Sequence, residues 1–332
     1  MSIVGRIVGK FQRIIRSVAY VLRRDQLLYP RKKSGDIIVM YHNIFPQADS
    51  RFNSRNIGIR DFEKHLHYFQ RRFKIVSLKE MLETRSDERR LAITFDDGLI
   101  NNIRYVAPML TRMKMPATFF VCSPFLRGSN ILWPDRLSMM GKYPRIAVTL
   151  DGDRFMRDSN SQYWNRESES LTDKLRYKHS SDIEALLDEA ENVKGGRVTD
   201  DTNRDYRWRA MKGEELKIIA ANPLFDFGGH SVAHDDYVHL SSEQIVEDVL
   251  DNKNYIQQST GRQVEYFAYP FGSYNNNVDN AVASCGMTHR LVVDYADVRD
   301  KNNPQLHNRF GFYNDRPCIE QLHEMNRFFH EK

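Results

Sequence analysis

Two adjacent carboxylates, Asp96 and Asp97, directly follow an apolar run, Leu91–Phe95, that predicts a buried strand. Successive side chains of a strand point to opposite faces, so two acids at its end can serve different partners. One carboxylate could bind a cation while the other transfers a proton. An ordinary turn explains the same residues, because Asp-Asp-Gly is common turn chemistry and Gly98 tolerates positive φ. The two acids alone do not decide between these interpretations.

A pair of histidines, His230 and His234, follows another predicted strand at Phe225–Gly228. Imidazoles at this spacing can bind one ion if the chain between them forms a helical turn, and Gly228 and Gly229 would let the backbone bend there. On a surface helix such a pair is usually coincidental. Here it lies at the end of a strand, where (β/α) barrels collect catalytic groups. A carboxylate from another strand end would complete a metal site with open coordination positions.

The elements that must position these residues alternate between apolar runs and segments of helical periodicity. This alternation predicts parallel strands with helices packed outside them. The predicted strands are Ile37–His42, Lys74–Ser77, Leu91–Phe95, Ala117–Cys122, Phe225–Gly228, Glu265–Tyr269 and His289–Val293. Helices are predicted at 61–73, 101–113, 216–221, 242–258 and 278–285, and one begins near Ser77.

The alternation lapses from about 126 to 209, where the chain is polar and rich in charge. Only one helix is predicted there, at Ser181–Val193. Because the alternation resumes afterwards, we interpret this stretch as an insertion carried on one barrel loop.

Composition limits the function classes. A chain of 332 residues with 41% hydrophobic residues can build one large domain or two smaller ones. The net charge of +5 comes without a nucleic-acid-binding signature, so no nucleic-acid partner is expected. Three cysteines without paired spacing, and no secretory signal, favour a reducing, cytoplasmic location. No apolar run approaches the roughly 18 to 20 residues of a membrane span.

Residues 1–28 predict a basic amphipathic helix. Its apolar face carries Ile3, Val4, Ile7, Val8, Phe11, Ile14, Ile15, Val18 and Leu22, and its polar face carries Arg6, Lys10, Arg13, Arg16, Arg23 and Arg24. Such a helix is typical of a peripheral anchor on anionic lipid, here at the inner face of the membrane. The same apolar face could instead pack on the chain's own domain or on a partner protein, and this interpretation stays an alternative.

Three short motifs resemble a known family. Thr94–Gly98 resembles the first motif of the polysaccharide deacetylases, the NodB-homology or carbohydrate esterase 4 family. His230–His234 matches the second motif, His-Ser/Thr-x-x-His. Phe267–Gly272 is similar to the third motif in the branch that reads Phe-Ala-Tyr-Pro-aromatic-Gly. Three ordered motifs on successive strand ends are far more specific than any one of them.

The resemblance extends from about Ile37 to about Arg309, and Trp133–Leu137 is similar to an insert in members from surface-polysaccharide gene clusters. It implies an α/β fold, a distorted (β/α) barrel over residues 36–312. The insertion at about 126–209 would belong to this domain, and residues 313–332 would form a C-terminal helical tail.

The resemblance also implies roles for the motif residues. Asp97, His230 and His234 would hold a divalent metal ion, usually zinc in this family, with cobalt, nickel or manganese as alternatives. Asp96 would be the general base that takes a proton from the water molecule the metal activates. The backbone N–H of Phe271 would stabilise the tetrahedral oxyanion.

The implied function is a metal-dependent hydrolase that removes an N-acetyl group from an amino sugar, in a glycan or in a lipid-linked or nucleotide-linked precursor. Release of a formyl or O-acetyl group would use the same water attack. A catalytically silent relative that binds glycan in an assembly complex is a further alternative. In a third alternative, the main function of the protein lies in its N-terminal helix, which binds a partner in a membrane-bound complex.

The sequence departs from the family pattern at two places. Many members carry an arginine at the start of the third motif that orients the base, but Glu265–Phe267 contains none. The Leu-x-His that supplies a general acid is also missing in clear form, and His307, preceded directly by Leu306, comes closest. The proton donor is therefore unassigned, with His307, His289 and Arg309 as candidates.

Further candidates for contacts with the substrate or the metal ligands are His42, Trp133, Asp235, Tyr269, Pro270 and Arg309. His42 follows the first predicted strand, so it would reach the mouth of the barrel. Trp133 offers a face for stacking on a sugar. Asp235 and its neighbour Asp236 could accept a hydrogen bond from a ligand histidine. A structural role fits each of these residues equally.

Overall fold

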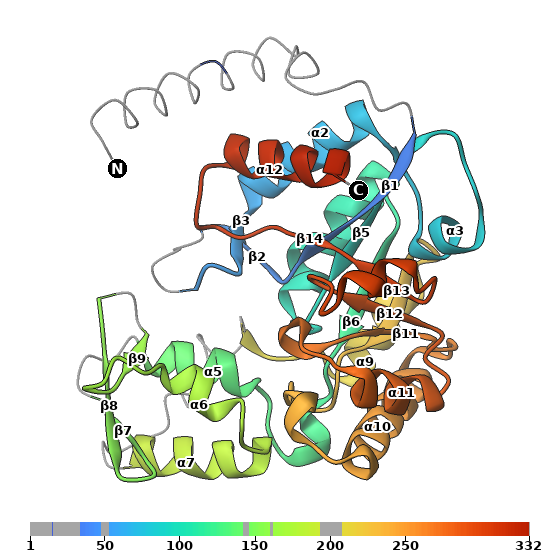
Figure 1. The fold of residues 1–332 in the computed structure, drawn as a ribbon. Coiled ribbons are helices and arrows are strands. Elements are labelled where there is room, and N and C mark those ends of the chain that lie inside the picture. Colours follow the sequence, from blue (N-terminus) through green and yellow to red (C-terminus); the bar gives the residue numbers. More distant parts are fainter. Residues whose placement is uncertain are drawn as a thin grey trace.

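A nearly closed barrel of parallel strands forms the centre of the fold (Figure 1). The structure is a computed structural model that describes residues 15, 34–47, 53–141, 146–159, 162–192 and 208–331. The barrel strands are β1 (Gly35–Tyr41), β5 (Arg89–Phe95), β6 (Ala117–Val121), β10 (Phe225–Gly229), β11 (Tyr266–Ala268), β12 (His289–Val292), β13 (Leu306–Asn308) and β14 (Phe310–Gly311). Their spatial order is β13-β12-β11-β10-β6-β5-β1-β14, and β4 (Lys74–Ile75) pairs with β5. Since β13 and β14 are separated by one residue, the two ends of the sheet path lie close together.

Helices surround this barrel, as the alternation predicts (Figure 1). They are α2 (Ile59–Arg72), α3 (Leu78–Glu83), α4 (Ala107–Met113), α9 (Gly213–Ala220), α10 (Ser242–Thr260), α11 (Asn276–Ser284) and α12 (Cys318–Glu331). A π-helical segment, η2 (Asn102–Val106), leads into α4, and a small parallel pair, β2 (Asn43–Phe45) and β3 (Asn56–Gly58), precedes α2. None of the helices described is long and apolar enough to cross a membrane.

Alternation along the strands separates two apolar layers. Ile93 and Phe95 of β5 pack in the larger core with the surrounding helices, and Phe95 stacks on Phe119 of β6 at 5.3 Å between ring centroids. Ala92 belongs to a second, smaller core that includes residues of β6, β11 and β12. By the same alternation Thr94 and Asp96 follow Ala92 on its face of the strand. The strand therefore directs Asp96 toward the second core.

The segment from η3 to α7, between β6 and α9, folds beside the barrel with its own apolar core, built around residues such as Trp133, Phe155 and Leu187 (Figure 1). It comprises η3 (Pro124–Arg127), α5 (Trp133–Met140), β7 (Val148–Leu150), β8 (Asp153–Arg157), β9 (Tyr163–Trp164), α6 (Leu171–Leu175) and α7 (Ser180–Asn192). Strands β7, β8 and β9 form an antiparallel sheet. We call this segment the insertion.

The predicted fold class, a distorted (β/α) barrel, is confirmed, and every predicted strand overlaps an observed one. The helix predicted at Ser181–Val193 corresponds to α7, and the predicted tail contains α12. The strands of the insertion went unpredicted, because two to five residues give too short a pattern. Apart from Ile15, the predicted helix at 1–28 lies outside the described residues.

The expectation that Gly228 and Gly229 bend the chain is wrong, because both continue β10 in register with β6. Gly228 lies opposite Phe120, and a Cβ atom at position 228 would come within 2.4 Å of that ring. A side chain cannot be accommodated there unless Phe120 moves. The absence of a side chain at Gly228 therefore leaves space for the Phe120 ring in the barrel interior, and it does not serve a turn.

We expect Gly228→Ala to lower the free energy of unfolding by about 1–3 kcal/mol, because the added methyl group overpacks the core. Gly58→Ala is the matched control, since a Cβ atom at Gly58 meets nothing within 4 Å and its φ of −68° suits alanine. The control should change stability by less than about 1 kcal/mol. Urea unfolding followed by circular dichroism measures both, and equal stabilities would contradict the packing argument.

Candidate functional site

A cavity of about 390 Å³ opens at the carboxyl ends of the barrel strands. Among its lining residues are five of the predicted site residues that carry ionisable groups: His42, Asp96, His230, His234 and Tyr269. The barrel also contributes Arg55, Phe271 and Tyr313, and the insertion contributes Pro134, Ser138, Gln162 and Thr172. Barrel and insertion therefore build the cavity together.

Asp96 forms a buried, bidentate ion pair with Arg309. The two guanidinium nitrogens of Arg309 donate to Oδ1 and Oδ2 of Asp96 at 2.7 and 2.8 Å. The Arg309 side chain is fully buried, stacks over Phe120 at 5.4 Å and donates to Thr94 Oγ1 at 3.3 Å. Two parallel hydrogen bonds fix both the position and the plane of the carboxylate.

This pair also sets the charge of Asp96. Burial by itself would raise the pKa of the carboxyl, but the guanidinium of Arg309 and the imidazole of His230 outweigh it and lower the pKa below its ordinary value. Asp96 is therefore ionised at neutral pH. A carboxylate has about four acceptor positions, so it can still accept a proton or hydrogen bond from a molecule in the cavity.

Asp97 turns away from its neighbour and meets both histidines of the second motif. Its φ of +71° is in the left-handed region, which breaks the strand geometry immediately after β5. Oδ1 of Asp97 lies 3.4 Å from Nε2 of His230 and 3.5 Å from Nε2 of His234. This oxygen is fully buried and has no hydrogen-bond partner among the described residues.

The tautomer of His230 follows from its other contact. Nδ1 of His230 lies 2.7 Å from the carbonyl oxygen of Ala268, which can only accept, so Nδ1 carries the hydrogen. Nε2 then faces Asp97. Burial lowers the pKa of His230, but Asp96 and Asp97 outweigh burial and raise it above its ordinary value. The position between His230 and Asp97 therefore favours a positive charge.

The segment between the two histidines does not form the helical turn that their spacing suggests. Ser231 and His234 adopt φ of +67° and +64°, and Ser231 Oγ accepts a hydrogen bond from the backbone N–H of His234 at 2.7 Å. Two left-handed residues thus produce the bend that brings both imidazoles to Asp97. A left-handed conformation is uncommon for residues other than glycine, so periodicity alone cannot predict this bend.

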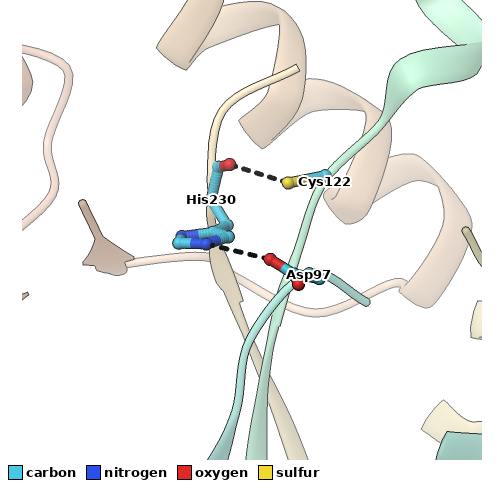
Figure 2. A group of neighbouring side chains, drawn as sticks. All are labelled: Asp97, Cys122 and His230. Atoms are coloured by element: carbon cyan, nitrogen blue, oxygen red, sulfur yellow. Dashed lines mark hydrogen bonds and ion pairs between the residues drawn. The ribbon is translucent and has the colours of Figure 1, made fainter. Parts of the chain in front are cut away.

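Cys122 lies against the same group. The ligand atoms of Asp97, Cys122 and His230 all lie within 4.8 Å of one another, and all three residues are buried (Figure 2). Cys122 Sγ donates to the backbone carbonyl of His230 at 2.9 Å. Burial, together with nearby carboxylates, raises the pKa of this thiol well above its ordinary value. The structure therefore contains a buried group that could hold a metal ion, with Cys122 as a protonated neighbour.

Arg55 connects this group to the insertion. Its guanidinium donates to Oδ2 of Asp97 at 3.1 Å and to Oδ1 of Asp135 at 2.5 Å. Burial raises the pKa of Asp135 to about 7, although Arg55 opposes this rise. Because Arg55 contacts Oδ2, the free oxygen of Asp97 is the one that faces the histidines.

Two further arginines hold the insertion against the chain that follows His234. Arg127 donates to Asp235 at 3.2 Å and to Asp248 at 2.7 Å, and Nε of Arg176 donates to Asp236 at 2.7 Å. Asp235 also accepts from the backbone N–H of Ser180 at 2.7 Å. The hydrogen bonds expected from Asp235 or Asp236 to a ligand histidine are thus not found, because both acids pair with the insertion.

Third-motif residues line or support the cavity. Phe271 adopts φ of +57°, and its ring lies against His234 at 4.5 Å and under Arg176 at 4.7 Å. Tyr269 lines the cavity and donates to Asp279 at 2.7 Å. Pro270 is buried and is not part of the cavity lining.

Trp133 is buried as well, with an exposed fraction of 1%, and its Nε1 donates to the carbonyl of His234 at 3.3 Å. Its ring is therefore not available to stack on a sugar. Instead, this indole supports the backbone of a motif histidine.

The two candidates for a proton donor on the last strands lie elsewhere. Nδ1 of His289 lies 3.1 Å from Nε2 of His307, and neither residue lines the cavity. His42 does line it, and burial lowers the pKa of His42 to about 4, so this imidazole is neutral at pH 7. Arg309, the third candidate, is the partner of Asp96.

Two functional arginines were missed or misassigned from sequence. Arg55 lies in the polar segment before the helix predicted at 61–73, and no spacing signals its contact with Asp97. Arg309 was considered only as a proton donor or substrate contact. Its place just after a strand end was the available signal, since such positions meet at the mouth of a barrel.

We expect Arg309→Met to lower the free energy of unfolding by about 3–5 kcal/mol, because it leaves the buried charge of Asp96 unpaired. The double variant Arg309→Met/Asp96→Asn removes both charges and should recover most of this loss. Chemical unfolding of the wild type, both single variants and the double variant measures the coupling. If the double variant loses the sum of the two single losses in free energy of unfolding, the interaction between Arg309 and Asp96 makes no direct contribution to stability.

Comparison with solved structures identifies the fold. The chain is similar to the deacetylase PplD of Streptococcus pyogenes, solved in complex with acetate, with a TM-score of 0.54 and 14% identity over 87% of this chain and 96% of that one. It is also similar to IcaB from Ammonifex degensii, with a TM-score of 0.52 and 16% identity over 88% and 96% of the two chains. At these identities the likeness concerns the fold. No curated protein is significantly similar to the chain.

A family model described as polysaccharide deacetylase matches residues 83–169 and 196–289, which is more than half of the chain. The matched residues include the Asp96-Asp97 pair and the histidines at 230 and 234. Arg309 lies outside the matched ranges. The chain belongs to the polysaccharide deacetylase family, whose members are also named NodB-homology or carbohydrate esterase 4 proteins.

Proposed function

We propose that this protein is a metal-dependent hydrolase that removes the N-acetyl group of an amino sugar in a glycan or glycan precursor. The observation that carries this proposal is the buried Oδ1 of Asp97, which makes no hydrogen bond and faces both Nε2 of His230 and Nε2 of His234. Membership of the polysaccharide deacetylase family supports the substrate class.

Two separations within the proposed donor set, both from Oδ1 of Asp97, fit a zinc ion. With metal–ligand bonds of about 2.0–2.1 Å, two ligands of a tetrahedral ion lie about 3.3–3.5 Å apart. The two separations from Asp97 Oδ1 in the structure, 3.4 and 3.5 Å, agree with this requirement. Two imidazoles and one carboxylate would also leave one position of a four-coordinate ion open, as in catalytic zinc sites. Cobalt, nickel and manganese are the alternatives for the same ligands.

We assign His234, and not Cys122, as the third ligand. A thiol must lose its proton to bind a metal, and burial disfavours the thiolate of Cys122. Its Sγ is also engaged with the His230 carbonyl. His234, by contrast, is neutral, because burial lowers its pKa to about 3, and a neutral imidazole is the metal-binding form.

The mechanism follows from the residues around this group. When bound, a divalent cation lowers the pKa of a water molecule and polarises the amide carbonyl of the substrate. Asp96, held by Arg309, accepts the proton as the water oxygen attacks the carbonyl carbon. The backbone N–H of Phe271 is our candidate donor to the resulting oxyanion. Asp96 then returns the proton to the amine nitrogen as the C–N bond breaks.

His42 completes the cavity as a neutral polar side chain, and we assign it to substrate contact. Asp96 both accepts and returns the proton, so the proposed reaction does not require His289 or His307. Neither of these histidines lines the cavity. The cytoplasmic location and the attachment of residues 1–28 to an anionic membrane stay predictions from the sequence, and so does the branch of the family.

A metal-binding experiment separates the two possible ligand sets. We expect isothermal titration of the metal-free protein with zinc chloride to show one site, which His234→Ala or Asp97→Ala weakens by at least about 100-fold, because each removes a ligand. Cys122→Ser is the matched control and should bind zinc like the wild type. Loss of binding in Cys122→Ser with normal binding in His234→Ala would contradict the assignment.

A turnover experiment tests the reaction itself. Acetate release from N-acetylglucosamine oligomers is the measurement, with formate release and O-acetyl ester cleavage measured alongside to test the other acyl groups. Asp96→Asn should retain zinc but lose at least about 10²-fold in turnover, because asparagine cannot accept the proton. Full activity of Asp96→Asn would refute this mechanism. A zinc-loaded wild type that binds glycan without releasing any acyl group would refute the proposed reaction.

A further inference from the structure

A second cavity, of about 610 Å³, lies on the antiparallel sheet of the insertion. It is lined by Gly152, Asp153, Arg154, Met156, Trp164, Asn165, Arg166 and Glu167. Met156 and Trp164 are cross-strand partners on β8 and β9, with exposed fractions of 45% and 39%. The other two tryptophans of the chain are buried, so Trp164 is the exposed one.

The indole of Trp164 is held in place at its polar edge. Nε1 of Trp164 donates to Oδ2 of Asp158 at 3.2 Å. Oδ1 of the same carboxylate accepts from the backbone N–H of Gln162 at 2.9 Å. Asp158 therefore orients both the exposed ring and the segment that leads into β9.

This segment also connects the two cavities. Gln162 lines the candidate catalytic cavity, and Trp164, two residues later, lines the second one. Two residues of extended chain span only about 6.5–7 Å, which is comparable with the length of one pyranose ring and its linkage. A ligand that leaves the catalytic cavity past Gln162 reaches the indole within a few sugar units.

The lining of the second cavity suits a neutral polyhydroxylated ligand. Its charges balance, with Asp153 and Glu167 against Arg154 and Arg166, so it offers no net attraction to a polyanion. The side chains of Arg154, Arg166 and Glu167 form no hydrogen bond or ion pair with another described residue, so they are available to sugar hydroxyls. The exposed indole can pack on the apolar face of a pyranose ring.

We propose that the cavity around Trp164 is an accessory glycan-binding site, and that the substrate is an oligosaccharide or polysaccharide that spans both cavities. The chemical class of this ligand rests on the proposed function. A nucleotide-linked monosaccharide would reach only the catalytic cavity. The accessory site therefore distinguishes a polymer from a small precursor.

Binding to the zinc-loaded, full-length Asp96→Asn variant tests this site without turnover. The probes are N-acetylglucosamine and its pentamers with β-(1→4) or β-(1→6) linkages, measured by calorimetry. Adding Trp164→Ala should weaken binding of at least one pentamer about tenfold and leave the monosaccharide unchanged. Adding Trp164→Phe should retain most of the affinity, because the ring face is kept. Tyr177→Ala is the matched control, an exposed aromatic residue of the insertion outside both cavities, and should change nothing.

Tryptophan fluorescence supplies an independent measurement. Because Trp164 is the exposed tryptophan, bound pentamer should protect the fluorescence from quenching by acrylamide, and the monosaccharide should not. Unchanged pentamer affinity in Trp164→Ala, no binding of either pentamer, or an equal loss in Tyr177→Ala would overturn the accessory site. Pentamer binding that depends on Trp164, in a wild type that releases no acetate, would refute the proposed reaction and still support the accessory site.

Discussion

The site depends on how the negative charges of two adjacent carboxylates, Asp96 and Asp97, are compensated where they are buried at the end of one strand. A buried charge without a partner is costly, so each carboxylate needs positive charge of its own. Asp96 obtains it from Arg309, inside the barrel, through two hydrogen bonds. Asp97 obtains part of it from Arg55, and its other oxygen makes no hydrogen bond and faces the imidazoles of His230 and His234. The difference between the two carboxylates is therefore one of environment, and it explains why one suits proton transfer and the other suits a cation.

The insertion does more than enclose the cavity. Arg127 and Arg176 attach it to the acids that follow His234, and the indole of Trp133 donates to the carbonyl of His234. These contacts stabilise a bend whose left-handed residues would be unfavourable in isolation. The same segment extends away from the cavity to an exposed indole. A single insertion thus supports a motif histidine at one end and offers a glycan-sized surface at the other.

Sequence reasoning predicted parallel strands with helices outside them because the strands are apolar runs, and these give the strongest local signal. The resemblance to the family implied that the strands close into a barrel. Sequence reasoning brought Asp97 and the two histidines together through their places at strand ends. It could not find the partner of Asp96, since Arg309 is more than 200 residues away and charge pairing across a barrel has no periodicity. It considered only a helical turn as the way for His230 and His234 to meet one ion, because spacing does not report left-handed backbone. The strands of the insertion were not predicted, because they are too short to show a recognisable alternation of apolar and polar residues.

X-ray absorption spectroscopy of the zinc-loaded protein tests the central claim, that Asp97 and the two histidines hold the metal. The proposed ligands predict a shell of nitrogen and oxygen atoms at about 2.0–2.2 Å, with the outer scattering of two imidazole rings. A sulfur atom at about 2.3 Å, with one imidazole only, would identify Cys122 as a ligand. That result would contradict the account.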